Sequence, residues 1–463
     1  MLTSIVETGE RLRKREVSPV ELTKDCLSLI EKLDPTLNAF ITVTVESALT
    51  QARAAEAEIL RGNWRGPLHG IPLALKDLID TAGIRTTAAS VLFKDRIPKE
   101  DAEVVRRLKD AGAVLLGKQN LHEFAYGGSS MISYYGEVHN PWDPARIAGG
   151  SSGGSAASIA AGLCYGAIGT DTAGSVREPA ALCGVVGLKP TYGRISARGV
   201  IPLSRSLDHV GPIACTVSDV AVMLRAIAGY DAKDAKSIDM PVGDYLPGIR
   251  EQSRPVRIGV PRKFFYADLD AEVASAVEQA LSTLAALGND LFEIEIDVPT
   301  DRTLQAAESY AYHREFVSRS PELYQPETLR RIRTGENITA EQKKQAEREL
   351  KQIRKEIGKI FEDVDLLVTP TTPIPAPAIA DLKRDPDALR PCELVLLRNT
   401  RPANAWGLPA ISIPCGFTKA GLPIGLQIIG PYWREDGVLQ LAYAYEQVTD
   451  WHKRSPRLTV LDC

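Results

Sequence analysis

The sequence lacks the features that define several classes of protein. Its 463 residues include seven cysteines but no Cys-x-x-Cys pair, which argues against a disulfide framework and against a zinc site. Lysine and arginine total 55 against 59 for aspartate and glutamate, so no basic surplus is available to neutralise nucleic-acid phosphates. The six histidines are scattered and show no metal-ligand spacing. We therefore expect no direct nucleic-acid partner, no metal and, from the odd cysteine count, a reducing compartment.

Signals for export and membrane insertion are missing as well. The N-terminal stretch Met1–Glu10 meets acidic residues before any apolar core, which is not the pattern of a signal peptide. The segment Ile147–Thr170 carries no charge for 24 residues and is long enough to span a bilayer. Seven of those residues are glycine and four are serine, which is typical of a loop and a small-residue helix. The sequence predicts a cytoplasmic protein with no membrane partner.

What the sequence does contain is the composition and periodicity of a large α/β protein. Apolar residues make up 44% and charged residues 25%, which is ordinary globular usage. Residues 1–65 are predicted to form an N-terminal helical segment, in which Ser18–Glu21 is a capping box. From Gly70 onward, strands alternate with helices. The expected strands are 71–76, 113–116, 165–169, 256–260, 365–368, 410–414 and 424–429, and the expected helices are 46–60, 103–111, 156–161, 271–286, 340–361 and 437–448. We predict a layered α/β/α sandwich around a mixed, largely parallel central sheet, in one large domain (1–463) with 231–254 as a surface excursion.

Three familiar motifs occur only in broken form. The segment Gly112–Gln119 nearly matches a P-loop, but glutamine replaces the Ser/Thr that would hold magnesium. The pair His122-Glu123 begins a zinc-protease motif, with Tyr126 where the second histidine should stand. The segment Gly149–Gly153 matches Gly-x-Ser-x-Gly, but two prolines just before it oppose the strand that such an elbow needs. With no dinucleotide fingerprint either, we expect no cofactor.

The block from Gly149 to Thr191 carries the most chemical information. Two serine-bearing glycine turns, Gly149–Ser155 and Gly169–Ser175, bracket a small-residue helix and a short strand. Glycine lets backbone N–H groups approach a ligand, so such a turn can present both a hydroxyl and amide donors. Either turn alone is explained by the ordinary preference of Gly and Ser for turns. The two together, with a lysine on an apolar run upstream, indicate nucleophilic catalysis.

A serine nucleophile needs a base, and this block contains no histidine. Lys76 ends the apolar run, and burial would lower the pKa of its ammonium from about 10.4, so that the neutral amine serves as the base. The alternative is a strand-end lysine paired with Asp77 or Asp80. A Ser-His-Asp triad would have to recruit a distant histidine, for which the candidates are His209, His313 and His452.

These segments resemble the amidase signature enzymes. The resemblance implies the amidase signature fold and a Ser–Ser–Lys triad. Ser175 would be the nucleophile, Ser151 the bridging serine on a cis peptide after Gly150, and Lys76 the terminal base. It further implies that a small-molecule linear amide is cleaved at its C–N bond through an acyl-serine intermediate, without a cofactor. The similarity extends in weaker form over nearly the whole chain, and its specific segments are Gly70–Asp77, Gly149–Thr191, Gly407–Pro414 and Gly421–Gln427.

The same resemblance implies roles for the neighbours of these residues. Met131 would lie beside the substrate through its backbone, and Gly150 and Ser152 would support the bridging serine. Asp171 and Arg177 flank the second turn and are expected to hold it by pairing. Walls of the substrate pocket are expected at Trp406 and at the proline-rich stretch 369–377. The alternative for that stretch is a plain connecting loop. The oxyanion hole would be formed by the backbone N–H groups of Thr172, Ala173, Gly174 and Ser175.

Three functions remain open at this point. The segment Pro190–Arg194 resembles the glutaminase (A) subunit of the glutamyl-tRNA(Gln)/aspartyl-tRNA(Asn) amidotransferases, which works with partner subunits. Two features argue against that branch. No acid lies between Glu393 and Gly407, where a glutamine-using member binds the amino group of its substrate, and the region Arg314–Gln352 is short. In its favour, Arg330-Arg331 resembles a carboxylate-binding site. We therefore favour a stand-alone amide hydrolase, with a homodimer as the default assembly. A non-catalytic binding subunit is the third hypothesis, and the presence of all three triad residue types argues against it.

Overall fold

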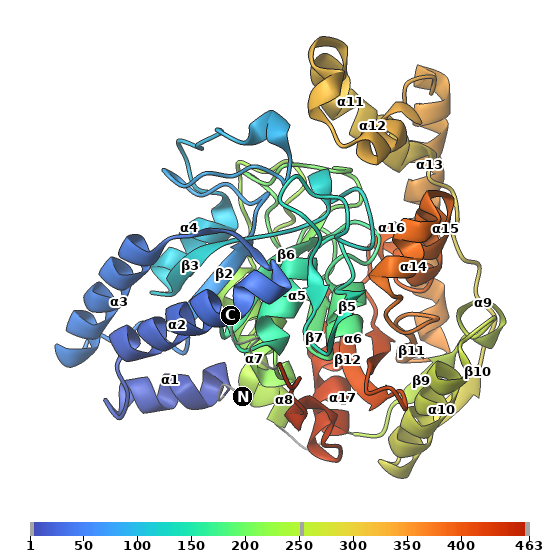
Figure 1. The fold of residues 1–463 in the computed structure, drawn as a ribbon. Helices are drawn as coiled ribbons and strands as arrows, with labels where there is room; N and C mark the ends of the chain where they lie inside the picture. The colour runs from blue at the N-terminus through green and yellow to red at the C-terminus, as the bar shows by residue number, and fades with distance from the viewer. Residues whose placement is uncertain (1–3, 251–253, 459–463) are drawn as a thin grey trace.

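The computed structural model describes residues 4–250 and 254–458. Its described strands form one eleven-stranded sheet in the order β1-β3-β2-β6-β8-β7-β12-β13-β11-β9-β10, together with the small β4-β5 pair (Figure 1). The strands are β1 (Phe40–Val43), β2 (Pro72–Lys76), β3 (Val114–Gln119), β4 (His139–Asn140), β5 (Asp143–Ile147), β6 (Gly166–Asp171), β7 (Val186–Lys189), β8 (His209–Ala214), β9 (Arg257–Val260), β10 (Asp290–Glu293), β11 (Leu366–Pro370), β12 (Ala410–Phe417) and β13 (Pro423–Ile429).

The sheet is mixed, and the pairing direction changes along it. Among the described strands, parallel pairs join β3, β2 and β6 at one side and β11, β9 and β10 at the other. The strands between these two groups pair antiparallel, because β12 turns back directly into β13 and β8 lies between β6 and β7 with opposite direction. The predicted α/β class with a mixed central sheet is confirmed.

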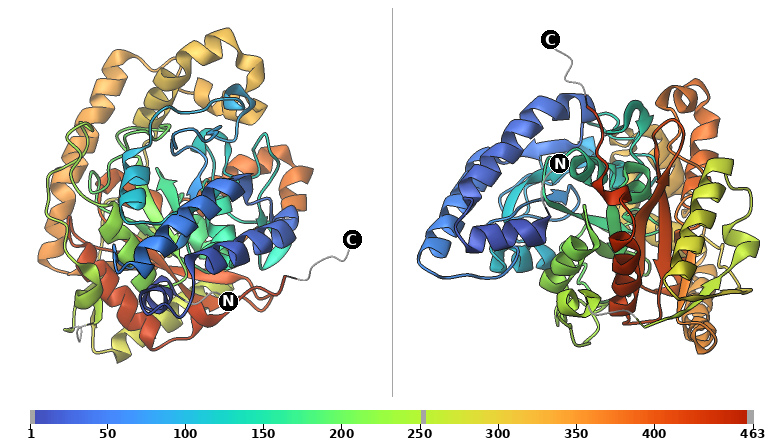
Figure 2. Two further views of the ribbon diagram at one scale, coloured as in Figure 1. Left: turned by 90° about the vertical axis from the view of Figure 1, so that its left-hand side faces the viewer. Right: turned by 90° about the horizontal axis from the view of Figure 1, so that it is seen from below.

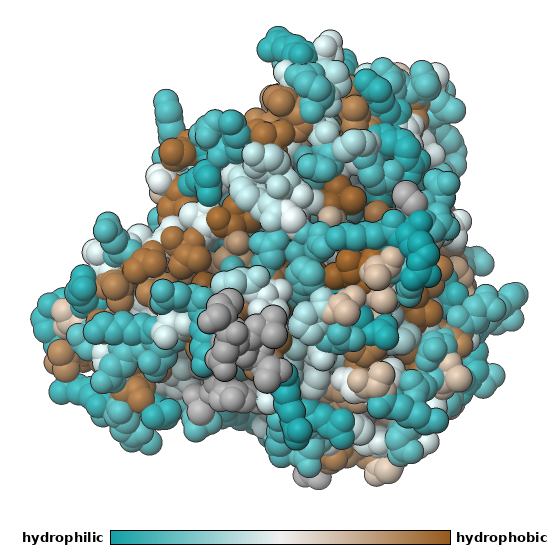
Figure 3. All heavy atoms as spheres, viewed as in Figure 1, coloured by the Kyte–Doolittle hydropathy of each residue, from teal (hydrophilic) through white to brown (hydrophobic). Residues whose placement is uncertain are grey.

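Helices pack on this sheet, and one group projects beyond it. Figure 1 shows α11 and α12 standing above the sheet, and Figure 3 shows polar residues covering most of that projection. Figure 2 shows α2 and α3 side by side at the β3 end. The helices are α1 (Ile5–Arg13), α2 (Pro19–Leu37), α3 (Val45–Leu60), α4 (Glu103–Asp110), α5 (Gly153–Ala160), α6 (Arg177–Cys183), α7 (Val217–Ile227), α8 (Tyr245–Arg250), α9 (Arg262–Phe265), α10 (Ala271–Ala286), α11 (Thr303–Arg319), α12 (Pro326–Arg333), α13 (Ala340–Glu356), α14 (Ile379–Arg384), α15 (Pro386–Leu396), α16 (Arg401–Trp406) and α17 (Glu435–Gln447).

The N-terminal region contains the predicted helices and one strand that the sequence analysis missed. The Ser18 hydroxyl accepts the Glu21 N–H at 3.4 Å while the Glu21 carboxylate accepts the Ser18 N–H at 3.2 Å, which is the expected capping box at the start of α2. The strand β1 then pairs antiparallel with β3 at the edge of the sheet. The region is therefore not purely helical, because its aromatic and β-branched run Phe40–Val43 extends the central sheet.

Residues 231–250 and residue 254 of the turn-rich segment are described, and residues 251–253 lie outside the described part of the chain. The segment contains α8, whose buried Tyr245 and Ile249 pack toward α7 and α17. The assignment of this segment as a surface excursion, like the single-domain organisation, stays a prediction.

The long uncharged segment forms buried structure at the centre of the sheet. Residues 147–170 make up the end of β5, a glycine turn, α5 and most of β6. Small residues are needed here, because a Cβ at Gly154 would collide with the main chain of Asn120 and Ala39. Within residues 4–250 and 254–458, no helix combines the length and the apolarity that crossing a membrane requires.

Candidate active site

Lys76 stands at the carboxyl end of β2, a strand whose five residues are all buried. Its Nζ donates hydrogen bonds to Ser151 Oγ at 2.7 Å and to Thr170 Oγ1 at 2.9 Å. Burial lowers the pKa of Lys76 from 10.5 to about 7, although the negative charges of Asp171 and Asp208 act in the opposite direction. At neutral pH a large fraction of this amine is therefore unprotonated and able to accept a proton.

The acidic neighbours of Lys76 in the sequence bind other cations. Asp77 faces Lys118, with 3.6 Å between the carboxylate and the ammonium, and Asp80 forms a bidentate pair with Arg96 at 2.6 and 2.7 Å. The alternative hypothesis of a strand-end ion pair between Lys76 and either aspartate is therefore wrong.

The first glycine turn presents Ser151 to this lysine. The peptide bond between Gly150 and Ser151 is cis, and the Gly150 N–H donates to Glu178 Oε2 at 2.7 Å. The Ser151 carbonyl accepts the His122 N–H at 3.2 Å and the Ser130 hydroxyl at 3.3 Å. A Cβ at Gly150 would lie only 2.8–2.9 Å from the backbone nitrogens of residues 129 and 130. Glycine is thus required for the close approach of these two segments.

The second glycine turn lies between the end of β6 and the start of α6, and it carries Ser175. Ser152 N–H donates to the Ser175 carbonyl at 3.2 Å, so the two serine-bearing turns meet. Ser152 Oγ also donates to the Thr170 carbonyl at 3.2 Å. Ser175 is only 4% exposed. The structure thus brings all three predicted triad residues into one buried region, and the Lys76–Ser151 contact is direct.

Hydrogen bonds within the second turn reduce the number of backbone N–H groups that are available to bind an oxyanion. Gly174 has a φ of 133°, and its N–H donates to Asp171 Oδ1 at 2.8 Å. This amide is already bound by a carboxylate, so it is not a free donor as predicted. The Ala173 carbonyl accepts the Thr400 hydroxyl at 2.7 Å, and the Thr172 hydroxyl donates to Asp208 at 2.6 Å. The oxyanion proposal therefore rests on the N–H groups of residues 172, 173 and 175.

Asp171 and Arg177 form a buried, bidentate ion pair at 2.9 and 3.0 Å. Burial alone would raise the pKa of Asp171, but the charge and hydrogen bonds of Arg177 hold it well below its usual range. Arg177 also donates to Gln427 at 2.6 Å and to Asn404 at 2.7 Å. Because Asp171 holds the Gly174 N–H at the same time, this network positions the turn that carries Ser175.

Several residues of the site were missed in the sequence analysis. Thr170 binds Lys76, Glu178 holds the cis turn, and Thr400 and Asn404 hold the Ser175 turn from elsewhere in the chain. The contact between Asn404 and Asp171 spans 233 residues, and no spacing in one sequence indicates such a pair. Thr170 and Glu178 lie inside the glycine-rich block, and this position was the one feature of the sequence that could have indicated a role in the site.

The candidate histidines have other partners. His209 Nδ1 contacts the Leu207 carbonyl at 2.7 Å, and His313 Nδ1 contacts the Tyr324 hydroxyl at 3.0 Å. His452 lies in the short helical turn 451–453 near the end of the described chain. In the described part of the chain, none of the three makes a hydrogen bond to Ser151 or Ser175. The geometry therefore favours lysine over histidine as the base.

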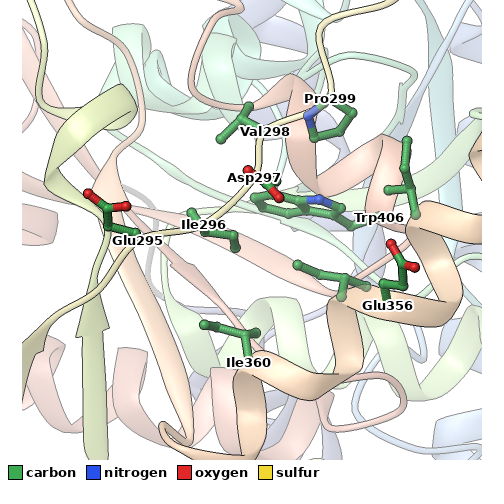
Figure 4. Close-up of a pocket in the computed structure, with 10 residues that line it drawn as sticks. Glu295, Ile296, Asp297, Val298, Pro299, Glu356, Ile360 and Trp406 are labelled. Carbon is green, nitrogen blue, oxygen red and sulfur yellow. The ribbon is translucent and has the colours of Figure 1, made fainter.

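The expected pocket walls are only partly near this site. The Met131 N–H donates to Ser129 Oγ at 3.3 Å, and its side chain packs in an apolar cluster with Ala376 of the proline-rich stretch. Trp406 instead lines a separate cavity of about 350 Å³ beneath the segment Glu295–Pro299, opposite Glu356 and Ile360 (Figure 4). That cavity contains none of the predicted triad or oxyanion residues.

The described residues contain no group of three or more His, Cys, Asp or Glu side chains arranged to hold a metal ion. The six cysteines in the described part of the chain are all free thiols.

The mixed α/β sheet carries a buried lysine beside two serine-bearing turns, and the comparisons with known proteins identify the family. A family model described as Amidase matches residues 21–439, so the chain belongs to the amidase family. This confirms the resemblance predicted from the sequence. The chain is 42% identical over 482 residues to the A subunit of glutamyl-tRNA(Gln) amidotransferase from Moorella thermoacetica, covering 98% of each chain.

Solved structures resemble the whole chain too. One is a 6-aminohexanoate cyclic dimer hydrolase complexed with substrate, with a TM-score of 0.90, 31% identity and 98% coverage of each chain. Another is the A subunit of glutamyl-tRNA(Gln) amidotransferase from Thermotoga maritima, with a TM-score of 0.79 and 35% identity over 96% of this chain and 95% of that one. The curated relatives favour the amidotransferase hypothesis over the stand-alone hydrolase that the sequence analysis preferred.

Proposed function

We propose that the protein hydrolyses a carboxamide through an acyl-enzyme on Ser175, with Ser151 as the proton relay and Lys76 as the base. The observation that carries this proposal is the 2.7 Å hydrogen bond between Lys76 Nζ and Ser151 Oγ in a fully buried setting. A lysine whose pKa is about 7 can take and return a proton near neutral pH. Membership of the amidase family supports the same chemistry.

The steps follow from these positions. Neutral Lys76 takes the Ser151 proton while Ser151 takes the proton of Ser175, and Ser175 Oγ attacks the amide carbonyl carbon. The resulting oxyanion is bound by the backbone N–H groups of residues 172, 173 and 175, each of which can contribute about 3 kcal/mol. The C–N bond then breaks, and the proton returns through Ser151 to the departing amine. Water attacks the acyl group by the same relay, which frees the carboxylic acid and restores Ser175.

A second candidate function is supported by the curated relatives, which are amidotransferase A subunits at 42% identity over nearly the full length. In this case the chain would release ammonia from glutamine and work with partner subunits. The surroundings of Ser175 offer little for the ammonium group of glutamine. Leu397 packs against the Gly174 turn, and both oxygens of the nearby Glu393 are already bound, by Ser129 and Arg331.

A serine-reactive fluorophosphonate tests the common chemistry without knowledge of the substrate. We expect one adduct by intact mass on the wild type, none on Ser175→Ala, and an unchanged adduct on the matched control Ser155→Ala, a buried serine bonded to Gln119. An adduct on Ser151 would refute the assignment of the nucleophile. A wild type that is neither labelled nor active on any amide would leave only the non-catalytic hypothesis.

A substrate panel separates the two branches. Ammonia release is measured from glutamine and from amides that lack an α-ammonium group, with the chain alone. A clear preference for glutamine would establish the amidotransferase branch. A preference for amides without the ammonium group would establish the stand-alone hydrolase.

A further inference from the structure

Four arginines from different elements gather beside the candidate active site. Arg302 precedes α11, Arg331 lies on α12, Arg390 lies on α15 and Arg401 begins α16. Figure 1 shows α11 and α12 standing above α15 and α16 at the same side of the molecule. Arg401 donates to the carbonyl of Asp301, the residue that precedes Arg302, so these two arginines lie on adjoining segments. Burial first, and then the positive charges of Arg401 and Arg390, lower the pKa of Arg302 to about 9.

Two chains of contacts join this cluster to the catalytic loops. Arg401 follows Thr400, whose hydroxyl donates to the Ala173 carbonyl in the Ser175 turn at 2.7 Å. Arg390 lies one helical turn before Glu393, which accepts the hydroxyl of Ser129 at 2.7 Å. Residue 129 in turn lies against Gly150 in the cis turn. The segments that carry Arg390 and Arg401 are therefore connected to both serine-bearing turns through Glu393 and Thr400.

One of the four arginines, Arg331, already binds two carboxylates and a carbonyl within the protein. Arg331 binds Glu393 at 2.7 Å, Glu327 at 2.8 Å and the Tyr126 carbonyl at 2.6 Å. Arg331 thus fixes α12 to α15 and occupies Glu393 Oε2, while Ser129 occupies Oε1. Arg331 therefore has a structural role through its Nε and Nη1, while its Nη2 has no hydrogen-bond partner.

The other three arginines make no ion pair shorter than 3.4 Å with a described carboxylate, although the negative charge of Asp301 acts on Arg401. Arg390 has one longer contact, of 3.4 Å, with the already engaged Glu393. Arg401 is 6% exposed, donates to the carbonyls of Pro299 and Asp301, and has an Nε without a hydrogen-bond partner. Arg302 makes no ion pair with any described residue. Arg401 is buried, and Arg302 and Arg390 are half-buried. Guanidinium groups withdrawn from water without a close counter-charge are costly, and their planar donor sets match carboxylates.

We propose that Arg302, Arg390 and Arg401 bind a carboxylate group carried by the amide substrate. The substrate class is then the monoamide of a dicarboxylic acid, without a free ammonium group. This inference rests on the proposed amide hydrolysis and deepens it. A cationic cluster repels an ammonium group, and the buried carboxylate of Glu393 beside it is already bound by Ser129 and Arg331. The anionic end of the substrate would therefore be recognised.

The test compares acidic and neutral amides of matched length. Ammonia release is measured for the monoamides of malonic to adipic acid, for the unbranched alkyl amides of the same length, and for glutamine, which adds an α-ammonium group to the glutaric monoamide. We expect the best acidic monoamide to exceed its neutral counterpart by about 100-fold in kcat/KM. Glutamine should fall below the glutaric monoamide by about tenfold, because of the added positive charge.

Substitutions assign this preference to the cluster. Arg302→Gln and Arg390→Gln should each lower kcat/KM for the acidic monoamide by about tenfold, mainly through KM, and leave the neutral amide within about twofold. Arg384→Gln, at an exposed arginine of α14 paired with Asp381, is the matched control and should change neither. Arg390→Lys keeps the charge and should retain part of the preference, which guards against a loss of folding.

Two results would overturn the inference. One is that no acidic monoamide is preferred over its neutral counterpart, and the other is that Arg302→Gln and Arg390→Gln lower both substrates equally. Fluorophosphonate labelling of Ser175 is measured on every variant. If labelling persists while the acidic preference is missing, the inference fails and the proposed function stands. If the wild type is not labelled and cleaves no amide, the proposed function itself fails.

Discussion

The burial of Lys76 predicts how the reactivity of Ser175 depends on pH. The lysine has no exposed surface, and burial lowers its pKa from 10.5 to about 7. This difference corresponds to about 5 kcal/mol in favour of the neutral amine. An ordinary lysine would be neutral in only about one molecule in 3,000 at pH 7, whereas about half of the Lys76 side chains would be neutral there. The fluorophosphonate reaction of Ser175 should therefore rise about tenfold per pH unit up to pH 7 and level off above it.

The assay is the rate of labelling between pH 5 and pH 10, read by intact mass, which needs no knowledge of the natural substrate. Lys76→Met should lower the plateau by about 100-fold or more and abolish the acid limb. Lys118→Met is a stringent control, because Lys118 is equally buried but donates to Thr86 and the Ile79 carbonyl. That variant should keep an inflection near pH 7 in its folded fraction. An inflection near pH 10 in the wild type, or an unchanged profile in Lys76→Met, would refute the reasoning.

The same burial predicts a pH dependence of stability, and its sign can be worked out. Between pH 7 and pH 10.5 the unfolded chain holds a proton on Lys76 that the folded chain has lost, so the free energy of unfolding rises with pH in that range. The cost of burying the lysine, about 5 kcal/mol, is complete below pH 7 and absent above pH 10.5. In urea denaturation, Lys76→Met should gain most over the wild type below pH 7, and this difference should shrink toward pH 10.5. A difference that stays constant with pH would contradict the shifted pKa.

Three further predictions concern the surroundings of the triad. Thr170→Val removes an acceptor of the Lys76 ammonium, so the pKa of Lys76 should fall further and the inflection in the labelling rate should move below pH 7. The control Thr170→Ser should keep the wild-type profile, and a shift of the inflection to higher pH in Thr170→Val would contradict this reasoning. Asp171→Asn leaves the buried Arg177 without its counter-charge, so urea denaturation should show a loss of about 3 kcal/mol, and a loss below about 1 kcal/mol would mean that the pair does not hold the turn. EDTA should leave labelling and amide hydrolysis unchanged, and activity lost with EDTA and restored by a divalent cation would contradict a metal-free mechanism.

Much of the fold was predictable because its elements carry a local signal. The helix predicted at 271–286 is α10 with the same bounds, and the apolar runs gave β2, β11 and β13 to within one or two residues. The strands β7 and β8 were missed, because their sequences contain glycine or proline and follow the glycine-rich block without alternation. Edge strands β1 and β10 are four residues long, too short for periodicity to distinguish them.

The candidate site, like the fold, was predictable only where its residues carry a local signal. The serine turns and Lys76 were visible from composition and burial, but their assembly came from the family resemblance, since the Lys76–Ser151 hydrogen bond spans 75 residues. The contacts that hold the Ser175 turn come from Thr400 and Asn404, more than 220 residues away. Hydrogen bonds of this range depend on how strands are ordered in the sheet, and one sequence does not encode that order in any local pattern.

The relatives and the charges around Ser175 point to different substrates, and the two observations differ in what they measure. An identity of 42% is spread over 98% of the chain and reports mainly the scaffold that buries Lys76 and aligns the two serine turns. The choice of substrate depends on a few side chains beside those turns. Leu397 offers no charge to an ammonium group, and Arg302, Arg390 and Arg401 make no ion pair shorter than 3.4 Å with a described carboxylate. Members of one family can therefore cleave different amides, and the charge pattern beside the proposed nucleophile is the more direct indicator of which amide this chain would accept.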